Sequence, residues 1–381
     1  MVQYSPQNVF DYEANNPYIP VMTEIWQSPH WPQFTYDTAK TAPLLAAASA
    51  AMGEIAGLKE GLSPTDQDDL ARAQLVQEAL ASFGIEGVAL NADDVEASVV
   101  ASLKHRDTAH LRRRSDAIAD LMVAARAPAR TLTPQVLQDW HRLLFFGIEV
   151  EDLGRWRSFD IEIVRSAVAG QGDVLFKAPP PDRVGGEMTR FLGWLNAPPA
   201  HPAPVTAAIA HLWFETIHPF SDGNGRIGRA LIDHIFARTR PLPFSLSRQI
   251  ERDKKGYYAA LTAGRAEGQG GVDATAFVLW FLQTMVDAAT AAKDEAMFLI
   301  RRNRFYLRHQ DVLSPRAKQV LERLFAQGPE RVGQGISARS YAKISGASPA
   351  TATRDLTAME NAGVLERTKA GGRSTSYRIV F

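Results

Sequence analysis

The chain has 381 residues, 45% of them hydrophobic and 22% charged, so it can bury a sizeable core and is long enough for two or three domains. It has no cysteine, which excludes a disulfide scaffold, a thiolate metal site and a cysteine nucleophile. Lysine plus arginine equals aspartate plus glutamate at 42 each, so the molecule as a whole indicates no polyanionic partner.

The balanced total hides a basic C-terminal part. Residues 301–381 hold 15 lysines and arginines against 6 acidic residues, a net charge of +9, and the first 300 residues therefore carry 27 against 36, a net charge of −9. A basic part on an acidic body indicates that this part has a partner of its own.

The sequence does not predict a membrane protein. Met1–Asn8 lacks a basic segment followed by an apolar run, so we expect no signal peptide. Nowhere do 18 uncharged apolar residues follow one another, so we expect no membrane span and a cytoplasmic protein.

The sequence predicts an N-terminal module over residues 1–100 that is irregular at first and helical afterwards. Its first forty residues are rich in proline and aromatic side chains, which we expect to pack against a later part of the chain. Helical periodicity and helix-start signals then predict helices at Thr41–Leu58, Asp66–Phe83, Asp93–Ala127 and Thr133–Leu144.

A β-hairpin interrupts the helices at residues 159–178. Phe159–Ile163 alternates, Gly170–Gly172 is a turn, Val174, Leu175 and Phe176 form a short apolar strand, and Pro179–Pro181 ends it. Helices are predicted again at Gly186–Leu195, Val205–Ile217, Gly225–Arg238, Lys254–Ala263 and Ala274–Arg302.

The last part of the chain, residues 311–381, has the pattern of a winged helix. Three helices, the second and third joined by a short turn, precede two strands that form the wing. The elements are expected at Ser314–Gln327, Ser337–Ser345, Pro349–Ala362, Val364–Thr368 and Ser376–Val380.

Residues 218–229, His-Pro-Phe-Ser-Asp-Gly-Asn-Gly-Arg-Ile-Gly-Arg, lie between two apolar helices. Gly223, Asn224 and Gly225 allow a sharp turn, which exposes unpaired N–H groups at the start of the second helix. Those groups and the helix dipole make a site suited to phosphates.

The other polar residues of this segment complete the chemistry of phosphoryl or nucleotidyl transfer. Arg226 and Arg229 are three apart on the helix and can both reach the anion. Asp222 is a hard oxygen ligand for Mg²⁺, and His218 is placed to accept a proton from an attacking hydroxyl. The alternative is a glycine-rich turn with a hydrogen-bonded histidine and two surface arginines.

The segment resembles the Fic-family motif His-x-Phe-x-(Asp/Glu)-Gly-Asn-Gly-Arg-x-x-Arg at every defined position. The resemblance implies that His218 is the general base, Phe220 a buried anchor and Asp222 the Mg²⁺ ligand. It further implies an anion hole at Gly223–Gly225, with Arg226 on the α- and β-phosphates and Arg229 on the γ-phosphate.

Glycine rather than lysine at position 225 is similar to the branch of the family that transfers nucleotidyl groups. Tyr257 and Tyr258 resemble the residues on the adenine side, although a core role is open for each. In the family a hairpin flap pairs with the target's backbone, which implies that Val174, Leu175 and Phe176 bind the target.

Residues 82–87 read Ser-Phe-Gly-Ile-Glu-Gly and resemble the family's inhibitory motif. Ser82 and Glu86 are four apart, so on a helix they share one face. The resemblance implies that Glu86 pairs with Arg229 in a two-point fork and occupies the place of the γ-phosphate. His211, His234 and Glu215 are read only as structural residues.

The resemblance covers about residues 20–300 and implies an all-α fold: a Fic catalytic core at residues 101–300 with a hairpin flap, after the helical lead-in and before the winged helix. The implied function is transfer of AMP from Mg-ATP to a serine, threonine or tyrosine hydroxyl of an unidentified target protein, and of the chain itself.

Several alternatives stay open at this point. The same site could transfer UMP or phosphocholine, or remove AMP, and the chain could be a DNA-binding regulator whose core senses a nucleotide. The basic winged helix would bind DNA through Arg354 and Arg373 or would serve contacts such as a homodimer.

Overall fold

The computed structural model describes residues 24–104, 113–127, 131–164, 174–368 and 375–381. The chain divides into two compact units, Met1–Ala292 and Lys293–Phe381. Helices predominate in both, as expected, and each unit is described by itself. The boundaries expected between the lead-in, the core and the winged helix stay a prediction.

The described lead-in packs its aromatic side chains against the core, as the sequence indicated. It comprises a short 3₁₀ turn, Ile25–Gln27, and strand β1, Phe34–Thr35, which pairs in parallel with β5, Gly271–Asp273. The indole of Trp31 donates to Glu187 and its ring packs edge-on against Trp213. Apolar area and these bonds fix the lead-in to the core.

Two helices follow, α1 at Thr38–Glu60 and α2 at Pro64–Ile85. Ser63 caps α2 by accepting a hydrogen bond from the amide of Asp66, and Pro64 occupies the first turn, where its missing N–H is tolerated. The buried carboxylate of Glu78 accepts from the hydroxyl of Ser245 and the amide of Ser247. These bonds fix α2 against the core.

The single helix expected at Asp93–Ala127 is wrong. The structure has two helices here, α3 at Ala92–Lys104 and α4 at Arg114–Ala125, which pack against each other. Ser98 of α3 donates to Asp116 of α4, a pairing that a continuous helix could not make. Both segments are helical in period, and periodicity does not show a reversal between them.

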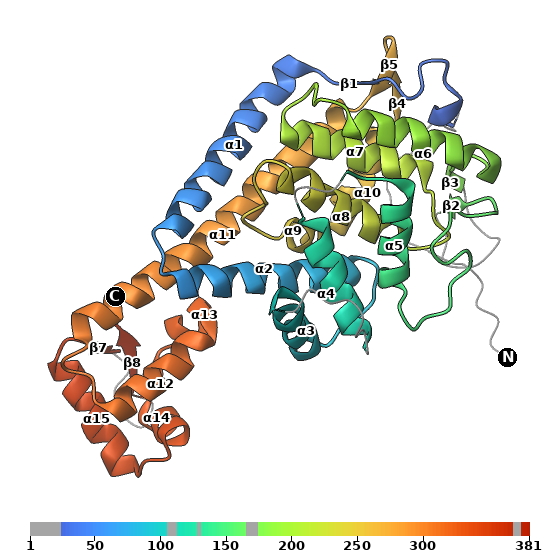
Figure 1. Ribbon diagram of the computed structural model, residues 1–381. Helices are drawn as coiled ribbons and strands as arrows, with labels where there is room; N and C mark the ends of the chain where they lie inside the picture. The colour runs from blue at the N-terminus through green and yellow to red at the C-terminus, as the bar shows by residue number, and fades with distance from the viewer. Residues whose placement is uncertain (1–23, 105–112, 128–130, 165–173, 369–374) are drawn as a thin grey trace. The chain divides into compact units, whose positions relative to one another are not determined.

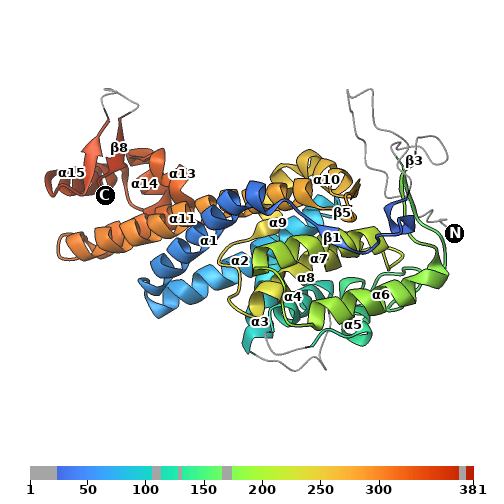
Figure 2. The ribbon, with the colours of Figure 1, turned by 90° about the horizontal axis from the view of Figure 1, so that it is seen from above.

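The centre of the first unit is a pair of helices, α7 at Ala203–Ile217 and α8 at Asn224–Ala237, which lie side by side (Figures 1 and 2). Nearly every side chain of α7 is buried, which explains why most of its residues are apolar. The helices around this pair are α5 (Pro134–Leu144), α6 (Pro181–Asn196), α9 (Leu246–Arg252), α10 (Lys254–Ala263) and the first part of α11 (Thr275–His309).

The expected hairpin is present as β2, Glu162–Val164, paired antiparallel with β3, Val174–Lys177. The expected turn at Gly170–Gly172 lies outside the described residues. A second hairpin, which we did not expect, pairs β4, Ala266–Gly268, with β5.

The second unit has the three helices and two strands expected for the winged helix, together with a short helix at Gly328–Gly333 and a strand at Ile336–Ser337 that were not expected. Strand order is β6-β8-β7, with a helix–turn–helix at α14 and α15 and a core of its own that includes Val320, Leu356 and Ile379. Its elements are α12 (Pro315–Ala326), α13 (Gly328–Gly333), β6 (Ile336–Ser337), α14 (Ala338–Ser345), α15 (Pro349–Asn361), β7 (Leu365–Arg367) and β8 (Ser376–Ile379).

Two helices, α1 and α11, are long and apolar enough by length and composition to cross a membrane. Half of the apolar stretch of α11 is buried in the protein, whereas 17% of that of α1 is buried. Core helices of water-soluble proteins share this property, so the absence of a membrane span stays a prediction.

Candidate active site

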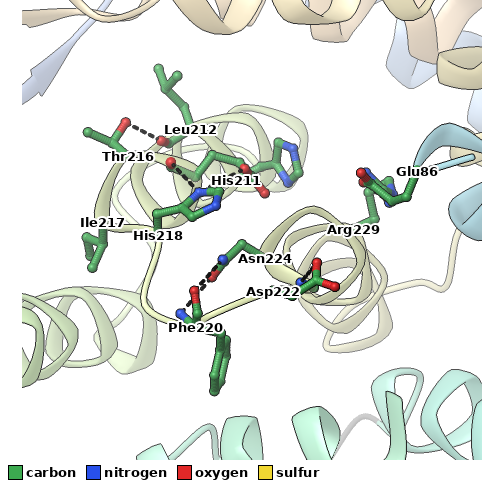
Figure 3. A network of polar contacts seen from close by, with 12 residues as sticks. Glu86, His211, Leu212, Thr216, Ile217, His218, Phe220, Asp222, Asn224 and Arg229 are labelled. Atoms are coloured by element: carbon green, nitrogen blue, oxygen red, sulfur yellow. Dashed lines mark hydrogen bonds and ion pairs between the residues drawn. The ribbon is translucent and has the colours of Figure 1, made fainter. Parts of the chain in front are cut away.

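His218 lies directly after the last turn of α7, in a left-handed backbone conformation with φ 51° and ψ 60°. This conformation is uncommon for a residue other than glycine, and it ends the helix. The imidazole Nδ1 lies 3.4 Å from the carbonyl oxygen of Glu215 (Figure 3). If Nδ1 carries the proton and donates it to this carbonyl, Nε2 is the free proton acceptor.

The turn after His218 is fixed by its own residues. The side chain of Asn224 accepts from the amide of Phe220 at 2.9 Å and donates to its carbonyl at 2.8 Å (Figure 3). Phe220 is fully buried and stacks on His141 with 4.3 Å between ring centroids. Phe220 is thus an anchor, as expected, and the side chain of Asn224 holds the turn.

Gly223 is required at the start of α8 for two reasons. Its φ of +79° favours glycine, and a Cβ there would lie 2.5 Å from Leu144 and 2.8 Å from Phe145. The first turn of α8 therefore begins close to a packed wall, with its unpaired N–H groups at the helix end.

Asp222 and Arg226 contact each other across this turn. Nη2 of Arg226 donates to Oδ1 of Asp222 at 2.9 Å, and the guanidinium lies over the rings of Phe83 and Phe145. The side chain of Arg226 is 4% exposed and that of Asp222 is 38% exposed. The carboxylate thus stands at the outer edge of the turn.

Arg229 faces the C-terminal end of α2, as the sequence indicated. Its Nη2 donates to Oε1 of Glu86 at 2.8 Å and to the carbonyl of Ser82 at 2.7 Å, and its Nε donates to the hydroxyl of Ser82 at 3.0 Å. The expected two-point fork is wrong, because a single hydrogen bond joins Arg229 to Glu86, and the other hydrogen bonds of this guanidinium go to Ser82.

Glu86 also lies at the start of α8. A Cβ on Gly225 would be 2.5 Å from Oε1 of Glu86, so the carboxylate sits against the first turn of this helix (Figure 3). Glu86 directly follows α2 as its C-cap, where the helix dipole disfavours a negative charge. The positive end of α8 and Arg229 offset that cost.

Two buried guanidinium nitrogens of the site have no hydrogen-bond partner among the described residues: Nη1 of Arg229 and Nε of Arg226. Buried donors are normally satisfied, and an unsatisfied one costs about 1–3 kcal/mol. Both nitrogens belong to the arginines at the helix start, which is what a site for an additional anion requires.

The electrostatics at His218 favour a neutral imidazole. Burial, followed by the charge of Arg265, lowers the pKa of His218 to about 4. Oε2 of Glu215 lies 3.8 Å from the imidazole, and burial raises the pKa of this carboxyl to about 7. A neutral ring next to a carboxyl of raised pKa is no ion pair. For Arg229, burial alone lowers the pKa, but Glu86 raises it overall.

The residues expected on the adenine side separate into two kinds. Tyr257 is 2% exposed and its hydroxyl is 2.7 Å from His211, so its burial favours a core role. Tyr258 is half-buried and keeps its predicted role as a candidate. His211 and His234 are buried and hydrogen-bonded, in agreement with their structural interpretation.

Only part of the predicted target-binding surface is described. Phe176 in β3 is half-buried, and the guanidinium of Arg265 lies 4.2 Å over its ring. Val174 and Leu175 belong to the same strand by their backbone, and their side chains lie outside the described residues. In the second unit, Arg354 is exposed on α15, whereas Arg373 lies outside the described residues.

Two buried arginines of the site, Arg157 and Arg265, have no counterpart in the sequence analysis. Arg157 contacts backbone carbonyls on both sides of the hairpin and at His218. Its partners are spread over the sequence and are backbone atoms, so no motif or spacing could have indicated it.

The fold and this turn define a class of protein: a helical domain with a helix start suited to an anion, an adjacent histidine and a hairpin beside them. Residues 131–236 match the model of the Fic/DOC family, and residues 25–104 match a domain of unknown function, DUF4172. Residues 131–236 are thus similar to the Fic/DOC family.

The curated relatives match over part of the chain. Protein adenylyltransferase Fic of Culex quinquefasciatus is 31% identical over 121 residues, which are 31% of this chain and 22% of that protein. A probable protein adenylyltransferase of Aquifex aeolicus is 34% identical over 86 residues, 23% of this chain and 25% of that protein. The chain thus matches about a quarter of each relative's length.

A solved structure shows the same fold. The crystal structure of a Fic family protein from Desulfovibrio desulfuricans is 24% identical, has a TM-score of 0.52, and covers 89% of this chain and 96% of that chain. The expected Fic fold is therefore confirmed.

Proposed function

We propose that the chain is a protein adenylyltransferase that moves AMP from Mg-ATP to a hydroxyl of a target protein and is restrained by Glu86. The single observation that carries the proposal is the start of α8. There a positive helix end, two arginines with unsatisfied buried nitrogens and the protein's own carboxylate meet, and the helix begins at Asn224, six residues after the half-buried His218. The names of the matched relatives agree with it.

His218 acts as the general base in this reaction. Its neutral imidazole accepts the proton of a serine, threonine or tyrosine hydroxyl while the hydroxyl oxygen bonds to the α-phosphorus. The bond from the α-phosphorus to the oxygen that bridges it to the β-phosphorus breaks, and pyrophosphate leaves with that electron pair. Burial keeps the ring unprotonated and available at neutral pH.

The helix start and its arginines bind the phosphates. The N–H groups of the first turn and the unsatisfied nitrogens of Arg226 and Arg229 are placed to stabilise negative charge. Tyr258 is the candidate for the adenine side.

Asp222 fits a magnesium ion. Mg²⁺ is commonly held by one or two carboxylates together with substrate phosphates, and Asp222 offers an outward carboxylate at the phosphate site. No group of three or more histidine, aspartate or glutamate residues in the described ranges could hold a metal by itself. When bound, the ion would neutralise charge on the phosphates.

Glu86 restrains the reaction because it takes the place of an anion. Its carboxylate lies on the first turn of α8 and on Arg229, the two features that would otherwise bind the terminal phosphate. Removing the carboxylate frees both. Ser82 holds Arg229 in place from the same helix turn.

The transferred group identifies the reaction. The Glu86→Gly protein is incubated with target-containing lysate and, in separate reactions, ATP labelled at the α- or γ-phosphate, α-labelled UTP, and CDP-choline labelled in the choline. Label in protein from α-labelled ATP alone, absent in Glu86→Gly/His218→Ala, is the expected result. Label from γ-labelled ATP, from UTP or from CDP-choline would assign another reaction.

A second candidate is DNA binding by the winged-helix unit. It rests on the net charge of +9 over residues 301–381 and on the exposed Arg354 of α15, the second helix of the helix–turn–helix. This unit would then act as an additional module beside the catalytic one, or would mediate a homodimer.

A further inference from the structure

The backbone around His218 is held from outside its own helix. The last carbonyls of an α-helix have no partner within it, and α7 ends in a left-handed residue, which needs support from its surroundings. Two buried arginines, Arg157 and Arg265, supply that support, and each also contacts the β2–β3 hairpin.

Arg157 binds the end of α7 and the two segments that flank the hairpin. Its Nε donates to the carbonyl of His218 at 2.7 Å, and its Nη2 donates to that of Ile217 at 3.4 Å. Its Nη1 donates to the carbonyl of Phe159, just before β2, at 2.8 Å, and its Nη2 also donates to that of Pro179, just after β3. The rigid, planar guanidinium thus fixes three backbone segments relative to one another.

Arg265 makes the corresponding contacts one turn earlier. Its Nη2 donates to the carbonyl of Glu215 at 3.1 Å and its Nε to the hydroxyl of Thr216 at 3.1 Å. Its guanidinium lies 4.2 Å over the ring of Phe176 in β3, a cation–π contact. Arg265 itself is 7% exposed. The four residues 215–218 are therefore bound in sequence by two arginines that also bind the hairpin.

We propose that Arg157 and Arg265 are positioning residues that fix His218 relative to the β2–β3 hairpin, so that a hydroxyl presented on the hairpin arrives at the imidazole Nε2. The inference rests on the proposed function, in which the hairpin holds the target. Transfer between groups held in a fixed geometry is sensitive to misplacement, and an error of about 1 Å can cost roughly 100-fold in rate.

The two arginines also act on the charge of His218. After burial, the charges that influence its pKa are those of Arg265 and Arg157, which lower it, and that of Asp222, which raises it, as does the hydrogen bond to the backbone carbonyl of Glu215. Both arginines stay charged at neutral pH, because burial lowers the pKa of each only to about 10. Loss of one positive charge favours the protonated imidazole, so it raises the pKa of His218.

The test compares Arg265→Met with Arg265→Lys in the Glu86→Gly protein. Methionine removes the charge and both hydrogen bonds, whereas lysine keeps the charge. We expect kcat for AMP transfer from α-labelled ATP, read as modification of the chain itself, to fall about 10- to 100-fold for methionine. The KM for ATP should change less than about twofold. The acid limb of the kcat/KM profile should move to higher pH for methionine and stay in place for lysine.

The matched control is Arg238→Met. Arg238 also caps a helix end, donating to the carbonyl of Leu195 at 2.8 Å, but that helix is α6. This variant should lower thermal stability without changing kcat or the acid limb. If Arg265→Met behaves like the control, or shifts KM for ATP as much as kcat, Arg265 is merely structural and the proposal is wrong. Arg157→Lys, which keeps the charge and loses the planar group, should lower kcat with an unchanged KM for ATP.

A second readout does not depend on activity. The pKa of His218 can be followed by NMR of the imidazole, assigned by its loss in His218→Ala, and should be higher in Arg265→Met than in Arg265→Lys. If the parent incorporates no label while this difference is present, the proposed function fails and the contact with His218 stands. If label is incorporated and neither kcat nor the pKa responds, the positioning role fails.

Discussion

Arg229 of α8 donates a hydrogen bond of 2.8 Å to Glu86, the residue that directly follows α2, across 143 positions of the chain. The carboxylate side chain is 15% exposed and the guanidinium 2% exposed, so the pair is partly shielded from water. A protein carboxylate therefore occupies the helix start that the proposed reaction needs for phosphate.

His218→Ala should abolish transfer and leave ATP binding nearly unchanged. The imidazole lies beside the carbonyl of Glu215, whereas Arg229 contacts Glu86, so in the proposed reaction the base acts on the acceptor hydroxyl and not on the phosphates. Turnover and ATP affinity are measured in the Glu86→Gly protein. Turnover within about tenfold of the parent would show that His218 is not the base.

The rate should be insensitive to pH near neutrality. Burial and Arg265 lower the pKa of His218 to about 4, and a base acts only when unprotonated. Activity is therefore complete above that pKa and lost as the pH falls through it. The kcat/KM of Glu86→Gly should stay level from about pH 7 to about pH 5. An acid limb near 6.5, the ordinary histidine value, would contradict the described environment of His218.

Gly223→Ala should destabilise the first unit more than Gly147→Ala. Both glycines have a positive φ, which costs alanine about 1–2 kcal/mol, but only at Gly223 would the new Cβ meet other atoms, Leu144 and Phe145. Overpacking adds about 1–3 kcal/mol. Urea unfolding of both variants measures the difference in the free energy of unfolding. Equal losses in the free energy of unfolding would mean that Leu144 and Phe145 move aside without a measurable cost.

Arg354→Ala with Arg373→Ala should weaken DNA binding and reduce its dependence on salt. Each lost phosphate contact lowers the salt slope by about 1. Retention of labelled duplex DNA is measured against salt concentration, with wild type alongside. A wild-type protein that retains no DNA at low salt removes this candidate function.

Most helices, and the turn that holds the motif, were predictable because they depend on the pattern of residues within one short segment. The core helix pair follows from apolar periodicity, and the turn between them follows from glycines and polar residues in one short segment. The reversal between α3 and α4 was missed because both parts carry the same period, and α9 because it has only seven residues.

The parts of the site that sequence reasoning missed depend on distant backbone atoms. Arg157 donates to the carbonyls of residues 159, 179 and 217, and Arg265 donates to the carbonyl of residue 215. No residue adjacent in the sequence to either arginine therefore indicates its role. The pairing of Glu86 with Arg229 was predictable from the motif, but its geometry was not. The fork was wrong because Nε of Arg229 donates to Ser82 and only Nη2 donates to Glu86.

The contact energy sets the size of the restraint. A hydrogen bond between charged groups contributes about 1.5–3 kcal/mol, and each 1.4 kcal/mol is a factor of about ten in rate. Glu86→Gly should therefore speed AMP transfer by about 10- to 150-fold. Glu86→Gln, which keeps the side-chain shape and removes the charge, should fall between wild type and Glu86→Gly.

The most direct test is AMP transfer from α-labelled ATP in wild type, Glu86→Gly, Arg229→Ala and the double variant. Glu86 and the terminal phosphate compete for one partner, so the two changes should not be additive. The account predicts fast transfer for Glu86→Gly and slow transfer for the other three proteins. If Glu86→Gly is no faster than wild type, or the double variant is as fast as Glu86→Gly, Glu86 does not restrain transfer through Arg229.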